Sequence, residues 1–163
     1  MMELLAEQII SRINRAAEVY HRLIIIVAQA GTGKTTALQD IHERTGIPLI
    51  NGNLELSRRM LELTGRQRAL QLPRLLAESV NASGGDVVLL DNIELLFDVS
   101  LKQDPLRLLQ GLSRNKTLVV AWNGSVNSGH LTYAVPEHPE YRRYVISDLL
   151  IVNPEKSEVM SEK

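Results

Sequence analysis

The residues most suited to chemistry form an eight-residue stretch at 28–35, Ala-Gln-Ala-Gly-Thr-Gly-Lys-Thr, directly after an apolar run at 23–27. The stretch matches the phosphate-loop pattern G-x-x-x-x-G-K-[ST] at every fixed position except the first, where Ala28 replaces glycine. In this pattern, backbone N–H groups and the N-terminus of the following helix surround phosphate oxygens. The sequence therefore predicts a nucleotide-binding strand, loop and helix, and the alternative is a glycine-rich turn that binds nothing.

Individual residues of this stretch have distinct predicted roles. Lys34 is expected to reach the β- and γ-phosphates, and the Thr35 hydroxyl is expected to ligate Mg²⁺. Because Gly31 and Gly33 are present, the tight part of the loop is intact. The predicted nucleotide-binding residues are Ala28, Gln29, Ala30, Gly31, Thr32, Gly33, Lys34, Thr35 and Thr36.

A second metal ligand is predicted at Asp91, which follows the apolar run at 87–90. A carboxylate at the end of such a strand has the position needed to hold Mg²⁺ together with Thr35. The alternative role of Asp91 is the N-cap of a following helix. A helix, a strand and further helices are expected between the loop and Asp91. That layout is typical of nucleoside triphosphatases in which another strand lies between the two motif strands.

The residue after this aspartate is Asn92, and an amide cannot act as a general base. Glu94 is the nearest carboxylate, and it either replaces the missing base or is an exposed acid in the first turn of a helix. Asn123 follows the predicted strand at 117–122 and either orients water beside the γ-phosphate or belongs to an Asn-Gly turn. We therefore expect slow hydrolysis, or none by the isolated chain.

The elements that must position these residues alternate between strands and helices. Apolar runs predict strands at 23–27, 47–51, 87–90, 117–122 and 145–152. Helical spacing predicts helices at 3–20, 34–45, 54–64, 66–80, 93–98 and 105–114. Such alternation predicts an α/β fold, with a parallel five-stranded sheet and helices on both faces.

The remaining segments complete the predicted organisation. We expect a single domain over 1–153 that begins with an amphipathic helix at 1–20, and a short, polar, mobile tail at 154–163. Pro73 is expected to kink or break its helix. The stretch 123–144 is expected to be rich in loops because it contains several glycines and prolines.

Composition limits the function classes. The 163 residues are 44% hydrophobic and 23% charged, with a net charge of −1, which is ordinary for a globular domain and does not indicate nucleic-acid binding. No apolar run approaches the roughly 18–20 residues of a membrane span, so we expect no membrane contact and a cytoplasmic location. The absence of cysteine excludes disulfides and thiolate metal sites. The four histidines lack metal-ligand spacing.

One charged cluster stands apart from the predicted site. It consists of Arg58, Arg59, Arg66, Arg68 and Arg74. In the sequence it is opposed locally only by Glu62. It is a subunit interface, a DNA-facing strip or a solvated helix face, and the lack of alternating aromatic residues weighs against single-strand binding.

The loop, the Asp91-Asn92 pair and Asn123 together resemble a reduced AAA+ ATPase core. The resemblance implies a P-loop NTPase fold that binds ATP and Mg²⁺, with Asn123 as the sensor-1 amide. Too few residues follow the fifth predicted strand for the C-terminal helical lid of that family. AAA+ proteins work as rings, which implies a nucleotide-dependent homo-oligomer with an arginine finger in trans. The candidates are Arg142, Arg143 and Arg114, and the alternative is that each is only a surface charge.

A more specific resemblance covers nearly the whole chain. The strings AQAGTGKTT, INGNLELSRRMLELT, LLDNIELLFD, AWNG and HPEYRRY resemble the BrxF family, the small P-loop proteins of type 3 BREX phage-defence systems of bacteria. This resemblance implies an antiviral role beside other BREX proteins: a DNA methyltransferase, a phosphatase-like protein, a Lon-like protease and a helicase. DNA contact would then be indirect.

Three functions stay open on the sequence alone. The first is an assembling ATPase. The second is an ATP-gated scaffold with negligible hydrolysis, because a ligand that prefers one conformation shifts partner affinity without turnover. The third is a small-molecule P-loop kinase in which the stretch 123–144 serves as the lid.

Overall fold

Strands and helices alternate along the chain in the computed structural model, which describes residues 2–16, 21–29, 31, 33–146, 149–153 and 158–161. The helices are α1 (Met2–Ala16), α2 (Lys34–Thr45), α3 (Gly52–Arg59), α4 (Gly65–Ala82) and α5 (Pro105–Leu112), with 3-10 turns η1 (Glu94–Phe97) and η2 (Val99–Leu101). The strands are β1 (Leu23–Ala28), β2 (Leu49–Asn51), β3 (Val87–Asp91), β4 (Thr117–Asn127), β5 (His130–Tyr133), β6 (Arg142–Val145), β7 (Leu150–Asn153) and β8 (Glu158–Ser161). Positions 17–20 of the predicted first helix lie outside the described residues.

Parallel strands form the centre of the sheet. The strand order is β2-β3-β4-β1-β7-β8, and the neighbours from β2 to β7 all pair in parallel. The protein therefore has an α/β fold with a mostly parallel sheet. Because β4 lies between β1 and β3, the additional strand expected between the two motif strands is present. The carboxyl ends of these strands lie at one edge of the sheet, so the residues that follow them are brought together.

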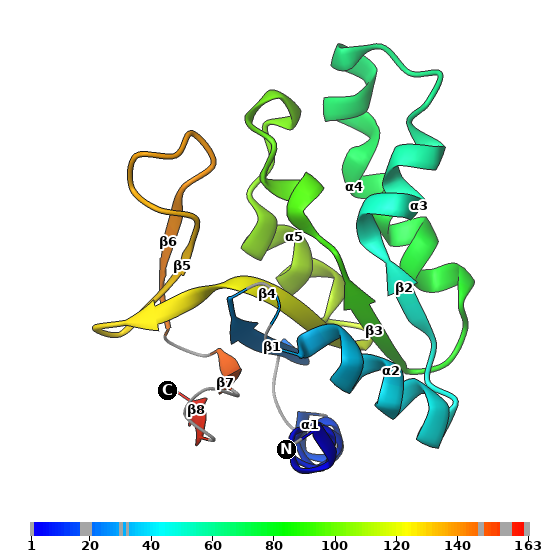
Figure 1. The fold of residues 1–163 in the computed structure, drawn as a ribbon. Coiled ribbons are helices and arrows are strands. Elements are labelled where there is room, and N and C mark those ends of the chain that lie inside the picture. Colours follow the sequence, from blue (N-terminus) through cyan, green and yellow to red (C-terminus); the bar gives the residue numbers. More distant parts are fainter. Residues whose placement is uncertain are drawn as a thin grey trace.

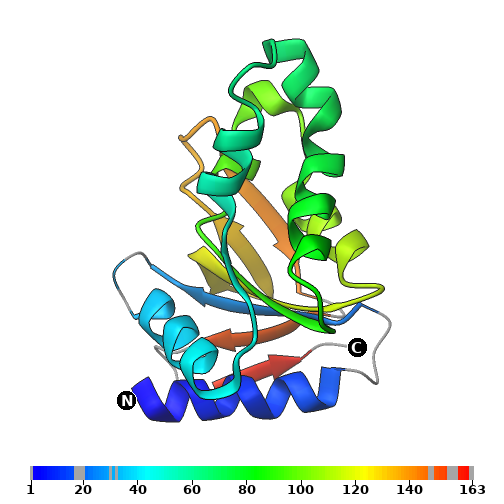
Figure 2. The same ribbon diagram turned by 90° about the vertical axis from the view of Figure 1, so that its right-hand side faces the viewer.

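Helices cover both faces of this sheet. Along β1, Ile24 and Ile26 pack into an apolar cluster with α1 and α2, whereas Ile25 and Val27 pack into a second cluster with α3, α4 and α5. Figure 1 shows α1 and α2 below the sheet and α4 and α5 above it. In the turned view of Figure 2, α1 runs along the lower face and the α3–α4 pair rises from the upper one. This alternation follows from the two-residue period of a strand.

Local signals place the helix ends. α2 ends at Gly46, whose φ of 78° is left-handed and whose N–H donates to the His42 carbonyl, as in a common glycine C-cap. α4 begins with a capping box, in which Thr64 and Gln67 each accept a hydrogen bond from the other's backbone N–H. In the part of the chain that the structure describes, no helix has the length and apolar character needed to cross a bilayer.

Pro73 does not break its helix, contrary to one reading of the sequence. α4 continues from Gly65 to Ala82 with Pro73 inside it. A proline has no N–H, so the carbonyl four residues earlier, at Ala69, loses its helical donor. The side-chain amide of Gln103 donates to that carbonyl at 2.8 Å. The helix therefore tolerates the proline because η2 and the segment after it supply the missing donor.

Two segments differ from their predicted structure. The stretch 123–144, expected to be loop-rich, contains the end of β4, all of β5 and the start of β6, which pair as antiparallel strands. Its inward-facing residues, among them Val126 and Leu131, alternate with less buried ones, and the nearby glycines and prolines obscure this strand pattern in the sequence. Residues 158–161, expected in a mobile tail, form β8 on the edge of β7.

Candidate phosphate-binding site

The phosphate-loop residues lie between the end of β1 and the start of α2. Gly31 and Gly33 have φ values of 83° and 95°, a left-handed conformation that glycine adopts without steric cost. Lys34 is only 5% exposed, and its ammonium donates to the carbonyls of Ala28 at 2.9 Å and Gln29 at 2.7 Å. The lysine thus folds back over its own loop, where its charge faces backbone oxygens. The predicted binding residues Ala30 and Thr32 lie outside the described residues.

The two predicted magnesium ligands are in direct contact. The Thr35 hydroxyl donates to Oδ2 of Asp91 at 2.6 Å, and the backbone N–H of Asn92 donates to Oδ1 of the same carboxylate at 2.9 Å. Asp91 is 8% exposed. The alternative reading of Asp91 as a helix cap is wrong, because Ile93 precedes η1 and makes no side-chain cap bond. A hydroxyl and a carboxylate at this distance offer the oxygen donors that Mg²⁺ prefers, so the residues fit that ion.

Asn123 enters the same site from β4. It is paired in register with Ala28, the last residue of β1. The alternative reading as an Asn-Gly turn is wrong, because Gly124 continues the strand and pairs with Tyr133 of β5. A side chain at Gly124 would collide with the hairpin, since a Cβ there would lie 1.9 Å from the Thr132 carbonyl. The glycine therefore serves a close strand approach instead of a turn.

These side chains line one cleft of about 370 Å³. Its lining, among the described residues, is Gly31, Gly33, Lys34, Thr35, Thr36, Asp91, Asn92 and Asn123. The structure thus brings the phosphate loop, the aspartate of β3 and the asparagine of β4 together. A small set of polar groups converging from several strand ends is the usual composition of a ligand site in an open α/β sheet.

Asn92 occupies a turn with special backbone geometry. Its φ is 53°, in the left-handed region where asparagine is one of the few tolerated side chains. Its carbonyl accepts a hydrogen bond of 2.7 Å from the Asn53 N–H. A Cβ at Gly52 would lie 2.9 Å from the same carbonyl, so the chain at the start of α3 approaches this turn closely. The backbone conformation therefore explains why an asparagine follows Asp91.

Glu94 is held by two asparagine amides. Its Oε1 accepts from Nδ2 of Asn53 at 3.0 Å, and its Oε2 accepts from Nδ2 of Asn123 at 2.8 Å. The carboxylate is half-buried, so the expectation of an exposed first-turn acid does not describe it. Sequence reasoning missed Asn53, although it lies two residues after the predicted strand at 47–51. The rule that parallel strand ends meet would have placed it at this edge of the sheet.

An aromatic cluster packs behind Asn123. Phe97 stacks on Tyr133 with ring centroids 3.5 Å apart and meets Trp122 edge-on at 5.1 Å. Trp122 is fully buried, and its indole N–H donates to the Thr132 carbonyl at 3.0 Å. Burial raises the pKa of Tyr133 to about 12, and the charges of Glu94 and Glu140 add to the rise. Asn123 therefore follows directly on a buried aromatic cluster.

The predicted arginine fingers lie outside the cleft of a single copy. Arg142 donates to the Gln103 carbonyl at 2.6 Å, and Nη2 of Arg143 lies 3.3 Å from Nδ1 of His130. Arg114 is exposed just before β4. The described lining of the cleft includes none of the three.

The arginine cluster of α3 and α4 is better compensated than its sequence indicates. Glu55 pairs with Arg58 and Arg59, and Glu78 pairs with Arg59 and Arg74. The Arg68 guanidinium donates to backbone carbonyls of the α3–α4 turn. The expectation that only Glu62 opposes the cluster is therefore wrong. Helical spacing brings Glu55 and Glu78 beside these arginines.

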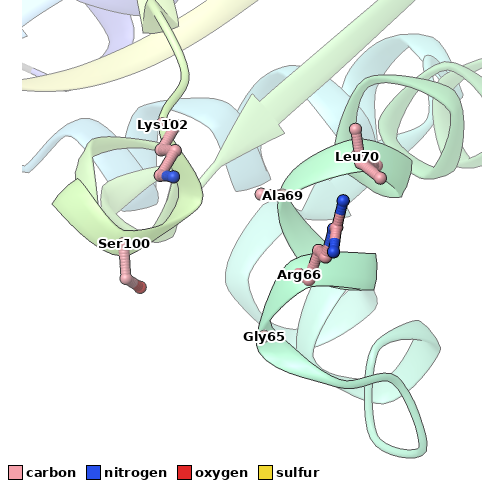
Figure 3. Close-up of a pocket in the computed structure, with 6 residues that line it drawn as sticks. All are labelled: Gly65, Arg66, Ala69, Leu70, Ser100 and Lys102. Atoms are coloured by element: carbon pink, nitrogen blue, oxygen red, sulfur yellow. The ribbon is translucent and has the colours of Figure 1, made fainter.

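Arg66, the remaining member of the cluster, lines a second and larger hollow of about 610 Å³ between α4 and η2. Its lining is Gly65, Arg66, Ala69, Leu70, Ser100 and Lys102. Figure 3 shows Arg66 and Leu70 of α4 on one side of this hollow and Lys102 and Ser100 on the other. Leu70 is 75% exposed, and Lys102 adopts a left-handed φ of 55°. This hollow combines two cations with exposed apolar surface.

Comparison with known proteins finds only weak structural similarity. No protein-family model matches the chain, and no curated protein matches its sequence. Among solved structures, the chain is similar to that of PCH-2 from C. elegans, with 19% sequence identity and a TM-score of 0.35. The match covers 78% of this chain and 35% of that one, so the chain spans about a third of the length of PCH-2. A TM-score of this size does not define a shared fold.

Proposed function

We propose that this protein binds ATP with Mg²⁺ in the cleft lined by Lys34, Thr35, Asp91 and Asn123, and that it hydrolyses the nucleotide slowly. The contact between Thr35 and Asp91 supports this most strongly. The two residues are 56 positions apart, yet their side-chain oxygens lie 2.6 Å from one another, at the two positions where the pattern predicts metal ligands.

Each residue of the cleft has a role in this proposal. The Lys34 ammonium leaves the carbonyls of Ala28 and Gln29 to bind phosphate oxygens. The hydroxyl of Thr35 and the carboxylate of Asp91 hold Mg²⁺, which neutralises phosphate charge when it is bound. Asn123 orients the attacking water. Asp91 is the only carboxylate among the described lining residues, which accounts for slow turnover.

A second candidate function is an ATP-gated switch with negligible hydrolysis. The same lining supports it, because the described cleft offers neither a carboxylate beyond Asp91 nor an arginine. Binding alone shifts the affinity for a partner when ATP prefers one conformation of the protein. The two functions share the binding site and differ only in turnover.

The proposal extends to an AAA+-like P-loop NTPase that assembles on binding Mg-ATP and acts within a BREX anti-phage complex. The position of β4 between β1 and β3 supports the first part, and the sequence strings that resemble the BrxF family support the second. In such an assembly, Arg142, Arg143 or Arg114 of a second copy supplies the arginine that is absent from the described lining of one copy's cleft. A trans arginine raises hydrolysis by roughly three to five powers of ten in other NTPases.

The test measures binding, turnover and mass on the same protein. Mg-ATP affinity is read from the fluorescence of Trp122, the sole tryptophan, and phosphate release gives turnover. Lys34→Ala abolishes binding. The matched control is Lys116→Ala, because Lys116 also donates to two backbone carbonyls, those of Val80 and Gly84, but far from the cleft.

The outcomes separate the proposals. Binding with turnover above background supports the ATPase, and binding without it supports the switch. No binding by the wild type overturns both. Light scattering with and without Mg-ATP tests assembly, where the monomer mass of 18.2 kDa rising to a defined multiple supports a shared site. A mass that stays at the monomer value contradicts the trans arginine for the isolated protein.

A further inference from the structure

Glu94 is absent from the described lining of the phosphate cleft, but it forms a hydrogen bond with Asn123, which is part of that lining. Both of its oxygens are occupied, one by Asn53 at 3.0 Å and the other by Asn123 at 2.8 Å. Asn53 is itself fixed, since its Oδ1 accepts from the Leu95 N–H at 2.8 Å and its own N–H donates to the Asn92 carbonyl at 2.7 Å. The carboxylate is therefore held on one side and presented to Asn123 on the other.

The chemistry of this contact determines how the Asn123 amide is oriented. A carboxylate accepts hydrogen bonds and donates none, so the amide must turn its NH₂ group toward Glu94. The carbonyl Oδ1 then faces the opposite way. Asn123 lines the cleft, whereas Glu94 is absent from the described lining. The side of Asn123 that remains for the cleft is its carbonyl oxygen, a hydrogen-bond acceptor.

We infer that Glu94 is a positioning residue that fixes Asn123 with its carbonyl oxygen toward the phosphate cleft, where it accepts a hydrogen bond from the attacking water. The inference rests on the proposed hydrolysis of ATP at this site. The water oxygen forms a bond to the γ-phosphorus, and the bond from that phosphorus to the bridging oxygen breaks, with its electron pair leaving on ADP. The water protons end on the released phosphate and in solvent, because an amide oxygen is too weak a base to take one.

This arrangement differs from the two readings that the sequence left open. Glu94 is neither a solvated acid nor a base in direct contact with the cleft. It acts through Asn123, and the left-handed turn at Asn92 brings it there. If the carboxylate were the base itself, its effect on rate would not depend on Asn123.

The decisive variant is Glu94→Gln, which keeps the shape of the side chain but supplies an NH₂ group that lets the Asn123 amide turn over. We expect kcat for phosphate release to fall about 10- to 100-fold, because misplaced water is costly at this step. The KM for ATP changes less than twofold, since the phosphate contacts are untouched. The matched control is Glu62→Gln, an exposed glutamate of the α3–α4 turn, with unchanged kcat and KM.

A double-mutant cycle separates positioning from direct catalysis. In the Asn123→Ala background, Glu94→Gln has no further effect on kcat if Glu94 acts only through Asn123. The inference is overturned if the losses of kcat in the two single variants multiply in the double variant and if Glu94→Gln alone also changes the acidic limb of the pH–rate profile. Glu94 is then the base.

A second measurement does not depend on hydrolysis. The side-chain NH₂ resonances of Asn123, identified by their loss in Asn123→Ala, shift and exchange faster with solvent in Glu94→Gln and stay unchanged in Glu62→Gln. Unchanged resonances in Glu94→Gln overturn the inference even where ATP is hydrolysed. A wild type that fails to bind Mg-ATP overturns the proposed function instead, and the resonances still report on the contact.

Discussion

The phosphate cleft and the hollow between α4 and η2 differ in how their polar groups are held. In the phosphate cleft, Lys34, Asp91 and Asn123 each have a hydrogen-bond partner within about 3 Å. Lys34 begins α2, whereas Asp91 and Asn123 belong to the central strands β3 and β4. In the larger hollow of Figure 3, Arg66 and Lys102 come from the surface of α4 and from the end of a 3-10 turn. The comparison shows that the smaller hollow has the converging, hydrogen-bonded polar groups that are typical of ligand sites, whereas the larger hollow has not.

The largest contrast is expected in stability. Phe97→Ala removes a 2% exposed ring that packs on Trp122 and Tyr133 behind the cleft, and such a loss costs about 3–5 kcal/mol. Leu70→Ala, at the rim of the larger hollow, changes stability by less than about 0.5 kcal/mol. Urea unfolding of both variants measures the difference. Equal losses would show that the rim of the larger hollow is part of the core.

The next contrast compares two aspartates. Asp91→Asn removes a buried charge from the predicted metal site, and hydrogen bonds to charged groups contribute about 1.5–3 kcal/mol, so Mg-ATP affinity falls roughly 10- to 100-fold. Asp98→Asn, whose carboxylate caps Ser100 at the larger hollow, leaves that affinity unchanged. Titration calorimetry with and without Mg²⁺ measures both. If Mg-ATP affinity fell in Asp98→Asn and not in Asp91→Asn, the nucleotide would be assigned to the larger hollow instead of the phosphate cleft.

A smaller effect is expected from pH on the aromatic cluster. An ordinary tyrosine has a pKa of 10.0, and that of Tyr133 is raised to about 12 in the folded protein. Between these values the unfolded chain releases a proton that the folded chain keeps, so stability falls by about 1.4 kcal/mol per pH unit as pH rises from 10 to 12. Thermal unfolding of Tyr133→Phe shows a shallower decline. The same slope in this variant would contradict the assignment to Tyr133.

The smallest effect is expected at the larger hollow itself. Arg66→Ala with Lys102→Gly removes two exposed cations and gives the left-handed position at 102 the residue that best tolerates it. Stability changes by less than about 0.5 kcal/mol, and Mg-ATP affinity does not change. Differential scanning fluorimetry and nucleotide titration measure these. A large loss of affinity would reverse the comparison between the two hollows.

The fold was predictable from the sequence where apolar runs were long. The continuous runs of β1 and β3 and the glycine that ends α2 place these elements to within a few residues. β5 and β6 were missed because they are short, half-buried and interrupted by turns. The effect of Pro73 was predicted wrongly because the donor that replaces its missing N–H, the side-chain amide of Gln103, comes from a segment distant in the sequence.

Some residues of the candidate site could be predicted from the sequence, and others could not. Residues 28–35 form a local pattern that the sequence displays directly, and Asn123 could be placed by its strand. The part that Glu94 plays could not be predicted, because it depends on Asn53 at the start of α3 and on a left-handed turn at Asn92. The rule on strand ends places Asn53 near the site, but neither its hydrogen bond to Glu94 nor the left-handed turn leaves a signature in a single sequence.

The turn at Asn92 also restricts which residues can replace this asparagine. A glutamate placed directly after Asp91 would have to adopt a φ of 53° there, a left-handed conformation that asparagine tolerates and most other side chains do not. The carbonyl of that residue accepts a hydrogen bond from the Asn53 N–H, and a Cβ at Gly52 would lie 2.9 Å from it, so the turn packs closely against the start of α3. A glutamate at this position is therefore not introduced without backbone strain by one substitution. The start of α3 has to be rebuilt first, so a change of side chain at 92 becomes favourable only after a change of backbone elsewhere.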